Sequence, residues 1–384
     1  MKRFFLLLII CFVGVQIFAL TDNVDNTSLH NKALGGPHSA MVKGFDSFFN
    51  NPALLSEYDE HFSIAKLDFN LKGDALSLIN LYLGGSLSLD DPSGIIQTLT
   101  DEELTRILFG LTLPGPISIG YIGNNWGWSV KNTTDVYLDI PSLIREITLI
   151  AREDLQFAVG ISFPIPVYTT DSFFIRISPG IMSRTTIRGE MKIDNDLLGL
   201  IGTVSDIDNI MDTYPIYLSP IFGLDGGFLV NFNDIISLSG VVKDIYTPIL
   251  KYPVTTFDDA LNVFTNSGDT SGALLHREIN FGLAGDIPLG PLSLVVNDLD
   301  VYFDYFDLLL FDKNPWLHLG MGVDINLLGK FHLLAGFNEG LLALGLNVEL
   351  KGFNIGFSMY GTEESPQPGM RPTFNFLLST GISF

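Results

Sequence analysis

The sequence predicts an all-β protein, a transmembrane outer-membrane β-barrel of about 14 antiparallel strands with short helices in its outer loops. Apolar residues alternate with period two over about the last seventy residues. The residues between them are small and polar. The chain is also hydrophobic overall without containing an apolar run of helix length.

The alternation is clearest at the carboxyl end. Apolar side chains occupy every second position in four successive segments: 317–327, 342–350, 353–359 and 374–384. Between them lie mainly Gly, Ser and Asn rather than the Lys and Glu of a solvent-exposed sheet. Bulky apolar residues facing outward and small polar residues facing inward are typical of a barrel in lipid.

The composition supports a membrane protein of this class. The mean hydropathy is +0.33, and only 17% of residues are charged. Beyond the first 19 residues, no segment has the ~18 consecutive apolar residues that a spanning helix needs. Alternating strands spread the same hydrophobicity over many short segments.

Residues 1–19 are predicted to be a secretory signal peptide. Lys2 and Arg3 form its charged start, an apolar run follows, and Ala19 is a small residue before a polar stretch. The only cysteine, Cys11, lies within this segment. Cleavage after Ala19 would therefore leave a chain with no disulfide, no thiolate metal ligand and no cysteine nucleophile.

Residues 58–384 are assigned to the barrel. Alternation, turn residues and apolar runs predict fourteen strands. They span approximately 61–72, 115–123, 126–137, 152–165, 172–193, 220–231, 234–244, 274–288, 292–304, 315–326, 330–339, 341–351, 353–361 and 373–384.

The connections alternate in length. The even-numbered ones are mostly tight: Asn124-Asn125, Asn233, Gly290-Pro291, 327–329 and Gly352. The odd-numbered ones are mostly long: 73–114, 194–219, 245–273, 305–314 and 362–372. Outer-membrane barrels combine short periplasmic turns with long outer loops. The connection at 166–171 is longer than this pattern predicts, and that at 340 is shorter.

Three long connections carry helix signals. Thr100 to Glu103 has the capping-box pattern, and Leu104, Ile107 and Leu108 follow it at helical spacing. Apolar residues at helical spacing also occur within 197–211 and 260–264. The simplest interpretation is a small helix packed on the barrel rim in each loop. Several such helices together would form an apolar surface, with Ile207, Ile210, Met211, Leu261 and Phe264 as its most apolar members.

Other classes of function have little support. The net charge of −22 disfavours nucleic-acid binding, which needs a basic face. The six histidines show no local metal-binding spacing, so neither a metal nor a cofactor is expected. No Gly-x-Ser-x-Gly motif occurs, and no catalytic residues are assigned. We interpret His318 as a solvated lumen residue rather than half of a His–Ser pair in a barrel phospholipase.

The segment 33–55 resembles the hatch of FadL-type long-chain fatty-acid transporters. It has a glycine-rich start with Gly35 and Gly36, a run of small residues to Ala40, and Asn51-Pro52-Ala53 before the first strand. The terminal Phe384 is also similar to the family. Asp46 stands alone where the family has an acidic pair, so the sequence departs there.

The resemblance implies a monomeric barrel plugged by residues 20–57. In such a barrel, hydrophobic ligands are captured at the outer rim and pass a gate made by the hatch. Gly35, Gly36, Phe48, Phe49, Asn51, Pro52 and Ala53 are the gate candidates. The expected function is outer-membrane transport of long-chain fatty acids or similar molecules, with periplasmic termini, membrane lipid around the barrel and insertion by the barrel-assembly machinery. A general porin and a non-transporting assembly or secretion partner remain alternatives.

Overall fold

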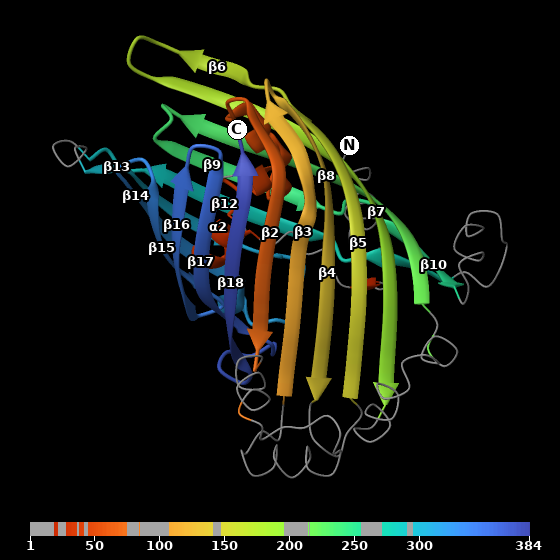
Figure 1. Cartoon of the computed structure of the whole chain (residues 1–384). Coiled ribbons are helices and arrows are strands. Elements are labelled where there is room, and N and C mark those ends of the chain that lie inside the picture. The colour runs from red at the N-terminus through yellow and green to blue at the C-terminus, as the bar shows by residue number, and fades with distance from the viewer. Residues whose placement is uncertain are drawn as a thin grey trace.

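The computed structural model describes residues 19–21, 28–36, 38–41, 45–74, 84, 107–140, 147–195, 214, 216–254, 271–289 and 295–384. The chain forms an antiparallel barrel whose last strand hydrogen-bonds with the first strand of the wall. Figure 1 shows β2, β3, β4, β5 and β7 side by side in this wall. Among the described residues, no helix is both long and apolar enough to cross a membrane.

The elements have the following bounds. The amino-terminal segment contains β1 (Ala19–Thr21), α2 (Leu29–Ala33) and the 3-10 helices η2 (Phe45–Phe49) and η3 (Pro52–Ser56). The first half of the wall contains β2 (His61–Gly73), β3 (Ile107–Gly123), β4 (Trp126–Ile140), β5 (Ile147–Ser162), β6 (Ile165–Thr169), β7 (Phe174–Asn195), β8 (Ile216–Phe232), β9 (Ile236–Lys243) and β10 (Pro248–Val254). The second half contains β11 (Ser271–Leu275), β12 (Glu278–Asp286), β13 (Val296–Tyr305), the 3-10 helix η6 (Pro315–His318), β14 (Leu319–Leu327), β15 (Phe331–Asn338), β16 (Leu341–Leu350), β17 (Phe353–Glu363) and β18 (Pro372–Ser383).

The wall has the predicted fourteen strands. The sheet contains 18 labelled strands, of which β1 is a short parallel addition beside β11. Three wall strands are interrupted and carry two labels each. β5 and β6 both pair with β7, β9 and β10 both pair with β8, and β11 continues into β12. Counting each interrupted strand once leaves fourteen.

The lipid-facing alternation is confirmed. In β17 the apolar residues Phe353, Ile355, Phe357 and Met359 are exposed, while Gly356, Ser358 and Tyr360 between them are buried. Phe357 is 48% exposed and Ser358 is 0% exposed. The outer surface of the barrel is therefore an apolar band, and the small polar residues point inward.

The tight turns gather at one end of the barrel, which we call the turn end. Asn124 and Asn125 adopt φ values of 52° and 67°, as a two-residue hairpin turn requires. The turns at 233–235 and 351–352 and the carboxyl terminus lie at the same end. The opposite end, which we call the loop end, carries the longer described connections at 306–314 and 364–371, and also the tight turn at Glu339-Gly340. The Gly290-Pro291 turn, the capping box at 100–103 and the helix signals within 197–211 and 260–264 fall outside the described residues. Ile107 and Leu108, which the helical spacing predicts to continue the first of these helices, are instead the first residues of strand β3.

Several predicted boundaries differ from the structure, and three of the differences have a clear physical cause. The connection assigned to 73–114 is shorter, because β3 begins at Ile107 and continues past Pro114 through a register irregularity before Ser118. The connection assigned to 245–273 contains β10 and the start of β11. The wall strand is interrupted at Asp244, whose φ is 53°. Proline and a broken period obscured both strands in the sequence.

The third difference concerns Leu317, just before the start of strand β14. The alternation places it on the outer face of a strand, but it lies in η6 and is 2% exposed. Asn314 caps this short helix by accepting a hydrogen bond from the Trp316 backbone, and Pro315 occupies the first helical position. The wall strand β14 consequently starts only at Leu319.

Phe357→Arg should destabilise the barrel folded in lipid vesicles by about 2–4 kcal/mol, because a charge replaces an apolar side chain facing the bilayer. Asn354→Arg on the same strand is the control. Asn354 lines a cavity at the turn end and should tolerate the change with a much smaller loss. Equal losses in a folding titration would contradict the assignment of inner and outer faces.

Candidate functional site: a plug and two lumen cavities

The described residues between 28 and 56 lie inside the barrel, and we call this segment the plug. Its apolar side chains Leu29, Ala33, Leu34 and Met41 share one buried cluster with Leu334, Ala343, Tyr360 and Leu377 of the wall. A second cluster joins plug residues Phe45, Phe48, Phe49 and Leu55 to Ile122, Ala158 and Met182. The plug therefore has a packed interface with strands on both sides of the lumen.

Wall glycines allow the plug backbone to approach closely. A Cβ added at Gly180 would lie 2.4 Å from the Ala53 nitrogen. One at Gly336 would lie 2.3 Å from the Leu34 carbonyl carbon, and one at Gly345 would lie 2.5 Å from the Ala33 Cβ. The small inward residues seen in the sequence thus form a seat for the plug.

Gly35 and Gly36 allow the chain to turn after α2. Their φ values are +84° and +136°, which side-chain-bearing residues rarely adopt. There is also no room for a side chain, since a Cβ at Gly35 would lie 2.2 Å from the Phe337 oxygen. One at Gly36 would lie 2.3 Å from the Phe306 ring.

Asn51 joins the plug to itself and to the wall. Its side-chain oxygen accepts a hydrogen bond from the Ala53 backbone at 3.0 Å, which caps η3, and Pro52 follows as the first helical residue. Its amide donates to the Ser39 carbonyl at 3.0 Å and to the Phe228 carbonyl at 3.2 Å. The Asn-Pro-Ala segment is therefore a cap and a cross-link as well as a turn.

Phe48 and Phe49 are fully buried in the plug interface. Their rings lie 4.2 Å apart between centroids, and the Lys131 ammonium lies 4.3 Å from the Phe49 ring. Neither ring lines the two cavities described below. These two gate candidates therefore pack the plug against the wall.

A buried carboxylate forms the main polar attachment of the plug. Asp304 on β13 is 0% exposed. It accepts hydrogen bonds from the Ser39 backbone at 2.8 Å and the Ser39 hydroxyl at 2.7 Å, and it lies 2.7 Å from His38 Nδ1. The other His38 nitrogen lies 2.7 Å from the Leu34 carbonyl. Hydrogen bonds to a charged acceptor contribute more than neutral ones, so this contact fixes the plug strongly.

The plug lies between two cavities. The loop-side cavity has a volume of about 620 Å³ and is bordered by the plug residues Asn31, Lys32, Gly36 and Asn50. The turn-side cavity has a volume of about 420 Å³ and is bordered by Ser28, Leu29, His30, Phe45 and Asp46 of the plug. Adjacent residues of α2 therefore face opposite cavities.

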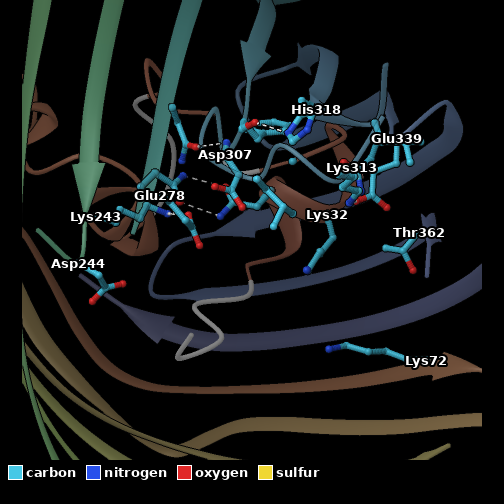
Figure 2. A pocket seen from close by; sticks show the side chains of 18 of the residues that line it. Lys32, Lys72, Lys243, Asp244, Glu278, Asp307, Lys313, His318, Glu339 and Thr362 are labelled. Carbon is cyan, nitrogen blue, oxygen red and sulfur yellow. Dashed lines mark hydrogen bonds and ion pairs between the residues drawn. The ribbon is translucent and has the colours of Figure 1, made fainter. Parts of the chain in front are cut away.

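The loop-side cavity is lined by both charged and apolar side chains, which come from the plug and from several wall strands (Figure 2). Most of its cations have carboxylate partners. Arg184 bonds to Asp225 and Asp244, Arg152 to Glu190, and Lys313 to Glu339. Lys32 differs, because no carboxylate of the described residues lies within 4.0 Å of its ammonium. Its ammonium lies 5.4 Å from the centre of the Tyr360 ring.

Part of the inner wall is more charged than the inward positions of the last strands predict. The inward positions of the last strands are mostly small, but β5, β7 and β8 carry a belt of buried ion pairs. Arg188 bonds to Asp154 at 2.7 Å, and Arg184 bonds to Asp225 at 2.8 Å. The alternation of inward and outward residues along each strand could have identified these positions as inward-facing. Which charges pair across neighbouring strands depends on the strand register, which the sequence does not show.

The five rim candidates, Ile207, Ile210, Met211, Leu261 and Phe264, all fall outside the described residues. No local sequence pattern marks Lys32, His38, Ser39 or Asp304 as functional residues. Asp304 alternates with apolar residues of β13, so its inward position was readable. Its contact with a residue 265 positions away was not.

No protein-family model and no curated protein matches this sequence. Among solved structures, the chain is similar to the Ralstonia pickettii toluene transporter TbuX, with a TM-score of 0.46 and 11% identity over 94% of this chain and 99% of that one. It is also similar to a Pseudomonas aeruginosa FadL homologue, with a TM-score of 0.39 and 12% identity over 96% and 99%. The P. putida toluene transporter TodX gives 0.40 and 10% over 93% and 99%. These scores assign no function.

Asp304→Asn should loosen the plug while the barrel still folds, because a neutral acceptor replaces the carboxylate that holds His38 and Ser39. Loss of hydrogen bonds to a charged group is expected to cost about 1.5–3 kcal/mol. Proteolysis of the purified protein should then cut within the plug faster than in the wild type.

Asp298→Asn on the same strand is the control, because Asp298 bonds to Asn326 of the wall rather than to the plug. Plug cleavage at the wild-type rate in Asp304→Asn, with the barrel folded, would contradict the attachment described above.

Proposed function

We propose that this protein is a plugged outer-membrane channel that takes up hydrophobic small molecules carrying an anionic head group. Long-chain fatty acids are the leading class. The observation that carries the proposal is the pairing of a lumen plug with a loop-side cavity, into which Lys32 brings a cation that no described carboxylate neutralises. In this proposal the loop end faces outward, and both termini face the periplasm.

The cavity has surfaces for both parts of such a ligand. Lys32 and the nearby polar groups suit a carboxylate. Ile150, Phe306, Leu310 and Leu317 supply apolar surface for the chain, where each buried methylene contributes roughly 0.8 kcal/mol. The outer rim residues named from the sequence would make the first contact with the ligand.

The plug would act as the gate. It closes the lumen between the two cavities through apolar packing and through Asp304, so passage requires its displacement. A ligand bound beside Lys32 contacts α2 directly, because Lys32 belongs to that helix. Ligand binding can therefore shift the equilibrium between a seated and a displaced plug, provided that it favours the displaced state.

A general porin is the second candidate. The buried charges on β5, β7 and β8 favour it, since charged walls are typical of aqueous channels. These charges are paired with one another, however, and the plug fills the lumen beside them. Large open-channel conductance of the wild-type protein in planar bilayers would favour the porin.

Lys32→Met should weaken oleate binding about tenfold, as expected for the loss of one charge-assisted hydrogen bond of about 1.4 kcal/mol. The measurement is displacement of a fluorescent fatty acid from the purified protein. Lys192→Met is the matched control, because Lys192 pairs with Asp194 and does not line the cavity. Unchanged oleate affinity in Lys32→Met would remove Lys32 from the ligand site, and absence of oleate binding by the wild type would refute the proposed substrate class.

A further inference from the structure

Two histidines and a buried carboxylate meet where the plug touches the wall at the turn end. His30 belongs to α2, Asp324 to β14 and His332 to β15. Each offers one ligand atom, and these atoms all lie within 4.8 Å of one another. Among the residues that the structure describes, no other group of three or more His, Cys, Asp or Glu side chains meets this criterion.

The two wall residues of the cluster, Asp324 and His332, contact each other directly. Asp324 is 0% exposed, and its two oxygens lie 3.0 and 3.1 Å from His332 Nδ1. Position 332 pairs with 326 across the strands, so Asp324 and His332 are diagonal neighbours on the inward face. The ring of His30 lies edge-on to that of His332, with 5.7 Å between centroids.

These groups match the donor preferences of zinc. Neutral imidazoles and a carboxylate bind Zn²⁺ at about 2.0–2.2 Å, and four ligands in a tetrahedron are usual. Glu349 is a further carboxylate near the site, 3.8 Å from His332 Nε2, and it adds negative charge close to a bound cation.

We propose that His30, Asp324 and His332 form a binding site for a divalent transition-metal cation such as Zn²⁺, with water completing the coordination. The ion reaches the site from the turn-side cavity, which His30 and Glu349 both line. Because one ligand lies on the plug and two lie on the wall, the bound ion clamps α2 to β14 and β15.

The clamp has a consequence for opening that rests on the proposed function. His30 and Lys32 are two residues apart on α2 and face the turn-side and loop-side cavities. A bound cation therefore opposes any displacement of α2 that a ligand at Lys32 favours. The metal site itself stands without this consequence.

The local sequence carries no sign of the site. His30 is followed by no second histidine at metal-binding spacing, and the other ligands lie near the opposite end of the chain. Only closure of the barrel around the plug brings the three residues together.

Isothermal titration of the full-length, metal-stripped protein in detergent with Zn²⁺ tests the proposal. The wild type should bind one Zn²⁺ per chain. His30→Gln and His332→Gln should each weaken this binding at least tenfold. Co²⁺ should give the visible absorption of a low-symmetry site in the wild type and lose it in both variants.

His276→Gln is the matched control and should bind zinc as the wild type does. His276 is also paired with a carboxylate, lying 2.7 Å from Asp307, but among the described residues it belongs to no group of three possible metal ligands. The heat-modifiable mobility of the barrel in gels confirms folding of each variant. If His332→Gln does not fold, His30→Gln decides, because it alters the plug and leaves the wall intact.

Failure of the wild type to bind stoichiometric zinc, or unchanged binding in His30→Gln, would overturn the proposal. Either outcome would mean that His30, Asp324 and His332 join the plug to the wall by hydrogen bonds alone and bind no metal. Zinc binding at these residues together with failure to bind oleate would refute the proposed transport and leave the metal site in place. Oleate binding without zinc binding would refute the metal site and leave the proposed transport in place.

Discussion

The arrangement of this protein depends on one buried carboxylate. Asp304 has no exposed surface, and its hydrogen-bond partners Ser39 and His38 both belong to the plug. An ionised carboxylate away from water is costly unless such partners surround it. Without the plug, the buried Asp304 of the wall would lose its hydrogen bonds to His38 and Ser39. Displacement of the plug must therefore either expose Asp304 to water or give it new hydrogen-bond partners.

The inward face of the wall is shaped to receive that plug. Gly180, Gly336 and Gly345 leave space that the backbone and small side chains of the plug fill, while Arg184 and Arg188 neutralise the carboxylates beside them. Among the described residues, two cavities border the plug, one on each side of α2. In the proposed function, plug movement is the step that connects them.

Periodicity in the sequence was sufficient to predict the barrel and the number of its strands. A strand that faces lipid on one side must alternate, and the band Phe353 to Met359 does so without interruption. The predictions failed where proline or a positive φ breaks the period, as before Ser118 and at Asp244. Contacts such as Ser39 with Asp304, or His30 with His332, join residues hundreds of positions apart, and no local pattern encodes them. The Asn51-Pro52-Ala53 segment was recognisable, but its bond to Phe228 was not.

A reversible cross-link between plug and wall tests the central claim that the plug must move for transport. The hydroxyl oxygens of Ser39 and Ser239 lie 2.7 Å apart, so cysteines at both positions can form a disulfide with little rearrangement. In a Cys11→Ser background, uptake of labelled oleate by cells should be lost when the Ser39→Cys, Ser239→Cys protein is oxidised and restored by a reductant. Equal uptake by the oxidised and reduced proteins, with the disulfide verified, would contradict the account.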